Sequence, residues 1–224
     1  MTEEKNRRNL IITIALFALF VLFTIAVCVV GVDAVGPNGS SVGFAKLNQS
    51  FAARHEFNSI WYGLTKILGY VAILICIFFA ATGVLQLVAG RSLKKVSPKL
   101  YALAGLYVAV AIFYAVFSKV VVNYRPILES DGTLESSYPS SHTMLAVCVF
   151  ISAIIQIMTG KGSEMFKKAI CVVLGVMTVV MVFGRLFSGV HWLTDIVGGV
   201  ILSAALLMAY YTALCSMYPK EEDY

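Results

Sequence analysis

Long uninterrupted runs of apolar residues dominate the pattern of this chain. Four of them carry no charged residue, and they span residues 10–32, 67–89, 100–118 and 196–218. A helix of this length rises by 1.5 Å per residue and crosses a hydrocarbon layer of about 30 Å. Two shorter runs lie between these spans, at residues 143–159 and 169–184, and become long enough with their flanking residues. The pattern therefore predicts an all-α, polytopic membrane protein with six transmembrane helices.

The segment between the first two spans carries a weaker signal. Within residues 44–57, the apolar side chains of Phe44, Leu47 and Phe51 fall at positions i, i+3 and i+7. This spacing favours an interfacial helix between helices 1 and 2, and a simple covering loop is the alternative. The chain has no internal repeat, low-complexity tract or linker, so we expect a single domain over residues 1–224 with its motifs at about residues 119–195.

Composition narrows the class of protein. The chain is 59% apolar and 13% charged, whereas soluble domains are about 45–50% apolar and about 25% charged. These values exclude an ordinary soluble domain, a disordered segment and a nucleic-acid binder, so we expect membrane lipids as partners and no nucleic acid. The first apolar run has 23 residues and exceeds the about 7–15 apolar residues of a signal peptide, which indicates a retained anchor.

The distribution of Lys and Arg predicts the orientation in the membrane. Eleven of the 17 basic residues lie in the two termini and in the loops after the second and fourth spans: Lys5, Arg7, Arg8, Arg91, Lys94, Lys95, Lys99, Lys161, Lys167, Lys168 and Lys220. Cytoplasmic loops of membrane proteins carry this excess. We therefore expect both termini in the cytoplasm and a multi-pass protein of the plasma membrane. The loops at residues 119–142 and 185–191 then face outside.

Polar residues gather at the ends of the spans that are expected to face outside. Arg125 follows helix three and Arg185 ends helix five, while His191 and Asp195 open helix six. If helix six starts near Gly189, His191 and Asp195 share one face, and the carboxylate reaches one imidazole nitrogen. That bond fixes the tautomer and leaves the other nitrogen free to attack an electrophile.

These residue types together indicate a phosphate site. Two arginines offer forked donors, and Ser140, Ser141 and His142 stand at a helix N-terminus, where free N–H groups favour anions. With one histidine as nucleophile and the other as proton donor, the chemistry is phosphoryl transfer through a phosphohistidine. No histidine stands at metal-ligand spacing from another His or from a Cys, so we expect no metal and no other cofactor.

The remaining charged residues of these loops have simpler interpretations. Glu129, Asp131 and Glu135 surround an Asp-Gly turn and are expected to form a solvated loop. Lys66, near the outer end of helix two, either snorkels or supplies a further cation to the site.

Three short motifs resemble those of the type 2 phosphatidic acid phosphatase family, the integral-membrane lipid phosphate phosphatases. Arg185, His191 and Asp195 match the spacing of the third motif, Ser-Arg-x5-His-x3-Asp. Residues 139–142 read Pro-Ser-Ser-His where the family has Pro-Ser-Gly-His. Lys119, five residues and Arg125-Pro126 stand where the family has Lys-x6-Arg-Pro. The six-helix layout is similar over the whole chain.

The resemblance implies a role for each matching position. His191 would be the nucleophile, Asp195 its orienting partner, and His142 the acid that protonates the leaving lipid alkoxide. Phosphate oxygens would be held by Arg125, Arg185, Ser140, Ser141 and Lys119.

Three departures bear on these roles. Lys119 is one residue too close to Arg125, which on a helix turns its side chain by about 100°, so its part as a phosphate ligand is in question. Ser141 replaces a glycine and adds bulk where phosphate approaches. Gly184 replaces a serine and removes a hydroxyl donor.

The resemblance and the site together predict a metal-independent phosphatase at the outer membrane face. Its substrate would be a lipid phosphate or pyrophosphate, such as undecaprenyl pyrophosphate, phosphatidate or phosphatidylglycerophosphate. A phosphotransferase of the same fold is one alternative. A non-enzymatic anion or proton transporter is another, although transporter sites usually lie near the membrane midplane rather than at one face. The pattern specifies neither the lipid nor an oligomeric state.

Overall fold

The computed structural model describes residues 3–129 and 131–217, so Lys220 and the last residue of the 196–218 run lie outside the described residues. Six of the described helices are long and apolar enough to cross a membrane. They are α1 (Glu3–Val29), α3 (Ser59–Gly90), α4 (Pro98–Phe117), α5 (Ser141–Met158), α6 (Glu164–Phe187) and α7 (Leu193–Met217). The prediction of an all-α protein with six transmembrane helices is confirmed.

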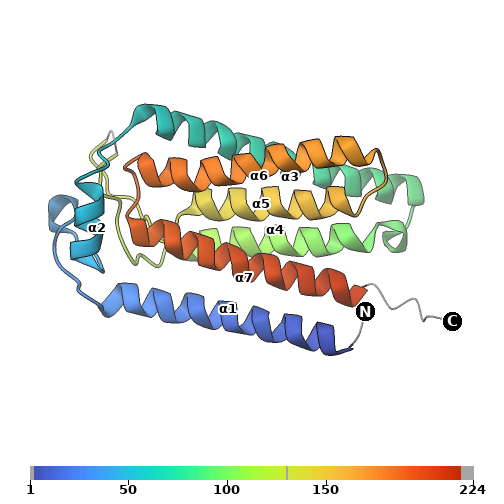
Figure 1. Ribbon diagram of the computed structural model, residues 1–224, viewed down its shortest axis with the longest axis horizontal. Coiled ribbons are helices and arrows are strands. Elements are labelled where there is room, and N and C mark those ends of the chain that lie inside the picture. Colours follow the sequence, from blue (N-terminus) through green and yellow to red (C-terminus); the bar gives the residue numbers. More distant parts are fainter. Residues whose placement is uncertain (1–2, 130, 218–224) are drawn as a thin grey trace.

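The six long helices run along the long axis of the molecule (Figure 1). Helix α5 packs against α3, α4, α6 and α7, and α1 packs along α7. Helix α5 contributes to the core, where Cys148, Val149 and Phe150 are fully buried. On the outside of the bundle, side chains such as Leu22, Leu85 and Val88 are about two-thirds exposed. An apolar outer surface of this kind fits the hydrocarbon of a bilayer.

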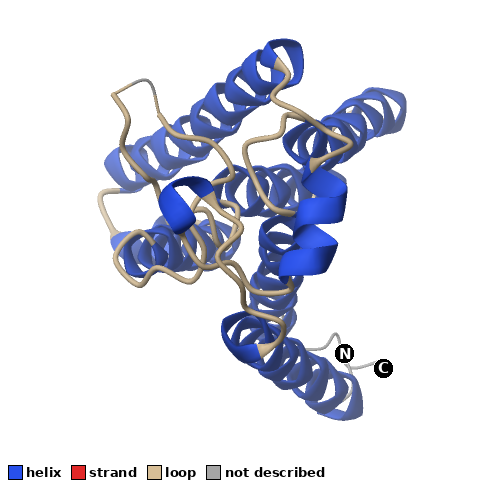
Figure 2. Cartoon of the chain, turned by 90° about the vertical axis from the view of Figure 1, so that its left-hand side faces the viewer, coloured by secondary structure: helices blue, strands red, loops and turns tan. Residues whose placement is uncertain are grey.

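One end of the bundle carries a layer of loops. The short helix α2 (Ala45–Ala52) lies at that end, and the N-terminus lies at the opposite one (Figure 1). Figure 2 looks onto this layer, where loops cross over the helix ends. The segments after α4 and before α7 belong to it, so residues from distant parts of the sequence meet there.

Helix α2 confirms the prediction of a short helix between the first two spans, with different contacts. It covers Ala45–Ala52 rather than residues 44–57, and Leu47 is 51% exposed. Its buried residues are Ala45 and Asn48. Polar contacts explain this orientation, because Asn48 donates hydrogen bonds to the Gly43 carbonyl at 2.7 Å and to the Thr194 hydroxyl at 2.9 Å. These bonds hold the side of α2 that carries Asn48 against the bundle.

The prediction that the last helix starts near Gly189 is wrong by four residues, because α7 begins at Leu193. Gly189 has a φ of +72°, and a Cβ there would lie 2.8 Å from the backbone of Glu56. The chain therefore makes a left-handed turn at a glycine that packs against another loop, and the helix begins only at Leu193. His191 accordingly lies in the turn before α7, while Asp195 lies in its first turn.

Candidate active site

His191 and Asp195 lie close together, although only Asp195 is helical and the expected hydrogen bond between them is not formed. The distance from His191 Nδ1 to Asp195 Oδ2 is 3.6 Å, and both side chains are buried. Asp195 Oδ2 also accepts a hydrogen bond from the Trp192 N–H at 2.9 Å. The other ring nitrogen, His191 Nε2, lies 2.9 Å from a terminal nitrogen of Arg185. Since a guanidinium only donates, Nε2 must accept, and the geometry assigns the ring proton to Nδ1, facing the carboxylate.

Arg185 is fully buried in the last turn of α6. Besides His191, it donates to the Thr65 hydroxyl at 3.4 Å, and its guanidinium lies 5.6 Å from the centre of the Tyr62 ring. None of the ion pairs found among the described residues includes Arg185, and its Nε has no hydrogen-bond partner. A buried cation without a carboxylate is costly, so this position favours an anion.

The charges around His191 affect its protonation. Burial, together with the positive charges of Arg185 and Arg125, holds the pKa of His191 well below its usual range. The imidazole is therefore neutral at pH 7, and Nε2 keeps the lone pair that a nucleophile needs.

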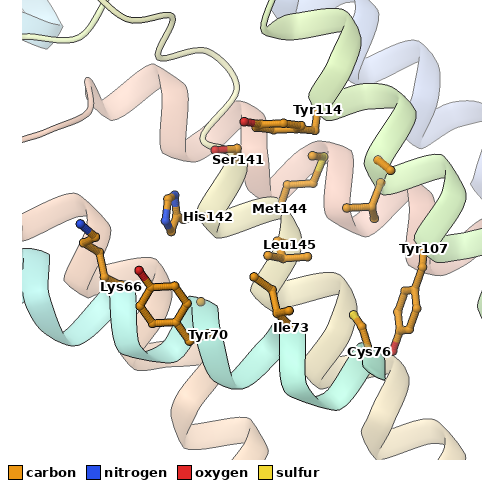
Figure 3. Close-up of a pocket in the computed structure, with 13 residues that line it drawn as sticks. Lys66, Tyr70, Ile73, Cys76, Tyr107, Tyr114, Ser141, His142, Met144 and Leu145 are labelled. Carbon is orange, nitrogen blue, oxygen red and sulfur yellow. The ribbon is translucent and has the colours of Figure 1, made fainter. Parts of the chain in front are cut away.

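His142 and Ser141 occupy the first turn of α5 and line two cavities. One is an apolar groove of about 470 Å³ between α3, α4 and α5, which Figure 3 shows with His142 at one end and Cys76 and Tyr107 at the other. The second is a polar pocket of about 400 Å³ that includes Arg125 and Glu135. Both cavities are lined by His142, which therefore stands where a polar and an apolar part of one ligand would meet.

Ser140, the other serine of this motif, points elsewhere. It is fully buried and lines neither cavity. Its N–H donates to the Asp195 carbonyl at 3.0 Å, and its hydroxyl accepts from Thr143 at 3.0 Å. Ser140 thus ties the start of α5 to α7, and Ser141 is the serine that faces the cavities.

The two candidate lysines differ in position. Lys119 lies exposed in the turn after α4 and lines neither cavity. Lys66 lines the apolar groove together with His142, and its Nζ lies 5.2 Å from the centre of the Tyr62 ring. Of the two lysines, Lys66 is therefore the one that lies in the same groove as His142.

Close contacts with neighbouring side chains explain why position 184 is a glycine. A Cβ at Gly184 would lie 2.7 Å from Thr65 Cγ2 and 3.1 Å from the Trp61 ring. A serine does not fit there unless the side chains of Thr65 and Trp61 shift. Thr65 on α3 accepts a hydrogen bond from Arg185 through its hydroxyl. The sequence did not predict this contact, because one threonine in an apolar helix gives no signal of a site.

Arg125 lies at the polar pocket, but two carboxylates already bind it. Its terminal nitrogens contact Glu129 at 2.9 Å and Glu135 at 3.0 Å. The expectation that both acids belong to a simple solvated loop is therefore wrong, because Arg125, 12% exposed, draws them to the site. Asp131 does remain exposed, and it accepts from the hydroxyl and N–H of Thr133 in a turn.

The two carboxylates are expected to compete with an anion for Arg125. Glu135→Gln removes one competitor and should tighten the binding of inorganic phosphate by about threefold to tenfold, which corresponds to about 1 kcal/mol. Titration of phosphate against the melting temperature of the detergent-solubilised protein measures this change. Asp131→Asn removes the same charge from the same loop without touching Arg125, and an equal gain in that control would reduce the effect to long-range charge.

Among the described residues, no group of three or more His, Cys, Asp or Glu side chains is placed to hold a metal ion. The donors that converge here are instead arginine, histidine and serine side chains at one end of a helical bundle. The structure thus defines a membrane protein with a buried, cationic, histidine-containing site.

Comparison with known proteins places this site in a family. The model of the PAP2 superfamily matches residues 71–215. A crystal structure described as the first transmembrane PAP2-type phosphatidylglycerolphosphate phosphatase from Bacillus subtilis superposes with a TM-score of 0.62 at 16% identity, over 94% of this chain and 98% of that one. Phosphatidylglycerophosphatase B of Bacillus subtilis (strain 168) is 34% identical over 89 residues, which are 39% of this chain and 42% of the relative.

The chain belongs to the PAP2 superfamily, because the family model covers more than half of it. This is the lipid phosphatase family that the three motifs resemble. The crystal structure shows the same fold.

Proposed function

We propose that the protein is a lipid phosphate phosphatase that works through a phosphohistidine on His191. The observation that carries the proposal is a convergence of buried donors around one lone pair. Arg125 Nε, Arg185 Nε and His142 Nδ1 are buried without a hydrogen-bond partner, and His191 Nε2 lies among these side chains. Buried polar groups are normally satisfied, and phosphate oxygens would satisfy these.

The proposed reaction has two steps. His191 Nε2 attacks phosphorus, the bond from phosphorus to the lipid oxygen breaks, and His142 gives that oxygen a proton. Water then attacks phosphorus, His142 takes a proton from the water, and the bond from phosphorus to Nε2 breaks to release phosphate. Asp195 stabilises the positive charge that develops on the His191 ring, while Arg185 and Arg125 bind the equatorial oxygens.

The groove beside His142 supports a lipid as the leaving group. Its far end, at Cys76 and Tyr107, adjoins a second apolar cavity of about 410 Å³ between α3 and α4. Acyl or prenyl chains would therefore lie along these helices while the phosphate stays at the arginines. Because a relative is a phosphatidylglycerophosphatase, phosphatidylglycerophosphate is the first substrate to test.

A phosphate-release assay on the purified protein tests the proposal. The panel comprises phosphatidylglycerophosphate, phosphatidate and undecaprenyl pyrophosphate in detergent, each with and without EDTA. We expect release from at least one of them, and activity that survives EDTA. A protein that releases no phosphate but transfers it to an added alcohol would be a phosphotransferase, and one that does neither would not be an enzyme of this class.

We also propose that the site faces outside the cell and that both termini are cytoplasmic. The support is the excess of basic residues in the loops at the opposite end of the bundle. Ser41→Cys, near the site, should react with an impermeant thiol reagent on intact cells, and Ser163→Cys, in the loop between α5 and α6, should react only after lysis. Both serines are exposed. Labelling of the unsubstituted protein measures the background from the native cysteines. The reverse pattern would invert the topology.

His142 is expected to matter in proportion to the basicity of the leaving group. In His142→Gln, hydrolysis of a lipid monophosphate should fall by about 10²–10⁴-fold, the usual contribution of a general acid. An aryl phosphate, whose leaving oxygen needs little protonation, should lose less than tenfold. Steady-state rates on both substrates measure the ratio, and equal losses would contradict the role of His142 as the acid.

A further inference from the structure

Two asparagine side chains are buried at the same end of the bundle as the site, and neither is one of the fixed positions of the family motifs. Asn48 on α2 is 0% exposed, and Asn123, which lies between Lys119 and Arg125 of the first motif, is 1% exposed. A buried amide is costly unless its oxygen and its nitrogen are both satisfied. Both amides meet this condition.

Asn123 is bonded to the carboxylate of the site. Its Nδ2 donates to Asp195 Oδ1 at 3.2 Å, and its Oδ1 accepts from the Gly43 N–H at 3.3 Å. The main chain is held as well, because the Asn123 carbonyl accepts from the N–H of Ser137 at 2.9 Å. Since both ends of the amide have partners, the side chain is fixed against rotation.

Asn48 binds the neighbouring residue and leaves Asp195 alone. Its Nδ2 donates to the Thr194 hydroxyl at 2.9 Å and to the Gly43 carbonyl at 2.7 Å, and its Oδ1 accepts from the Thr194 N–H at 3.2 Å. Gly43, shared by both amides, tolerates no side chain, because a Cβ would lie 1.6 Å from the Val27 carbonyl oxygen. The two asparagines thus share burial, chemistry and the partners Gly43 and Thr194, but only Asn123 is bonded to Asp195.

We propose that Asn123 is a positioning residue that fixes the carboxylate plane of Asp195 and, through it, the ring of His191. The proposal rests on the proposed function. Asp195 Oδ2 is held by the Trp192 N–H and faces His191 Nδ1, while Oδ1 is held by Asn123. With both oxygens bonded from different sides, the carboxylate cannot turn away from the ring. An oriented carboxylate keeps the proton on Nδ1 and the lone pair of Nε2 directed at phosphorus.

Without Asn123, the carboxylate of Asp195 loses one of its hydrogen-bond donors and keeps those from Trp192 and Ser137. Oδ1 loses a donor inside the protein, and the carboxylate gains freedom to rotate away from the imidazole. The arginines that bind phosphate are unchanged. The turnover number should therefore fall while the KM stays the same.

The test compares Asn123→Ala with Asn48→Ala. We expect Asn123→Ala to lower kcat by about 10–100-fold, the usual cost of losing a partner of this kind, with KM within twofold of the parent. Asn48→Ala should lower the melting temperature and leave kcat within threefold. In an Asp195→Asn background, Asn123→Ala should add less than a threefold loss, because residues acting as one unit are not additive.

A spectroscopic readout does not depend on the substrate. The chain has three histidines, so ¹⁵N-histidine NMR resolves them once each is assigned with its glutamine variant. His191 should show the Nδ1–H tautomer in all three proteins, because Arg185 still donates to Nε2. Its Nδ1 signal should be the same in the parent and in Asn48→Ala and should shift in Asn123→Ala, where the carboxylate moves relative to the ring.

The outcomes separate the two proposals. Equal loss of kcat in both alanine variants, or an unchanged His191 signal in Asn123→Ala, would make Asn123 a structural residue only. A parent protein that releases no phosphate from any lipid would overturn the proposed function, and the NMR comparison would still decide whether Asn123 orients the pair.

Discussion

His191→Gln is expected to abolish turnover, with a loss of about 10⁴-fold or more, as for other residues that form a covalent intermediate. The reason is the position of His191, because its Nε2 carries the lone pair that lies against Arg185. Rapid quench with a ³²P-labelled lipid phosphate should trap an acid-labile, base-stable phosphoenzyme in the parent and none in the variant. Phosphate release and the trapped label are both measured.

His55→Gln is the matched control for this experiment. His55 lies at the same end of the bundle as His191, but its Nδ1 is 3.1 Å from the Phe51 carbonyl and its ring stacks on Phe51 and Phe187. This variant should keep both its activity and the phosphoenzyme. A His191 variant that still hydrolyses lipid phosphate at near the parental rate would rule out the phosphohistidine, and the polar cluster would then need another explanation.

Arg185→Met should have opposite effects on stability and activity. It removes a fully buried cation that has no carboxylate partner among the described residues, so the anion-free protein should be more stable, by up to about 1–4 kcal/mol if the gain is as large as when buried ion pairs are replaced by apolar residues. For a chain of this size, each kcal/mol corresponds to about 2–4 °C in melting temperature. Activity should fall by about 10³-fold, as when a transition-state oxygen loses its main donor.

The readout of the Arg185 variant is a pair of melting curves, with and without inorganic phosphate in detergent. Phosphate should raise the melting temperature of the parent and leave Arg185→Met unchanged, since a ligand stabilises only the state that binds it. Arg54→Met removes an exposed arginine at the same end of the bundle and should respond to phosphate like the parent. A lower melting temperature with an intact phosphate response would show that Arg185 is needed for packing rather than for an anion.

The apolar pattern predicted the six spans well because length and hydrophobicity are local properties of the sequence. Helix boundaries were harder to predict from the sequence. At Gly189, for example, the chain packs against the backbone of Glu56, and α7 begins only after this turn. The sequence also did not predict which side of α2 faces the bundle. Asn48 turns inward because it bonds Gly43 and Thr194, and Thr194 lies far away in the sequence.

The candidate site shows the same division. His191 and Asp195 were within reach of sequence reasoning because their spacing is short. The Thr65 hydroxyl on Arg185 and the amide of Asn123 on Asp195 join segments far apart in the sequence. The carboxylates of Glu129 and Glu135 reach Arg125 through the conformation of one irregular loop. No periodicity or motif encodes such contacts, because they depend on which loops meet over the end of the bundle.

The groove beside His142 has a consequence for how the protein would meet its substrate. Tyr70, Ile73 and Tyr114 line it and are 61%, 45% and 59% exposed on the outer surface of the bundle. A lipid would therefore enter sideways, by diffusion in the plane of the bilayer, without leaving its leaflet. Rates would then follow the mole fraction of the substrate among the surrounding lipids rather than its molarity in the bulk. In effect, the membrane composition would act as the concentration variable of the reaction.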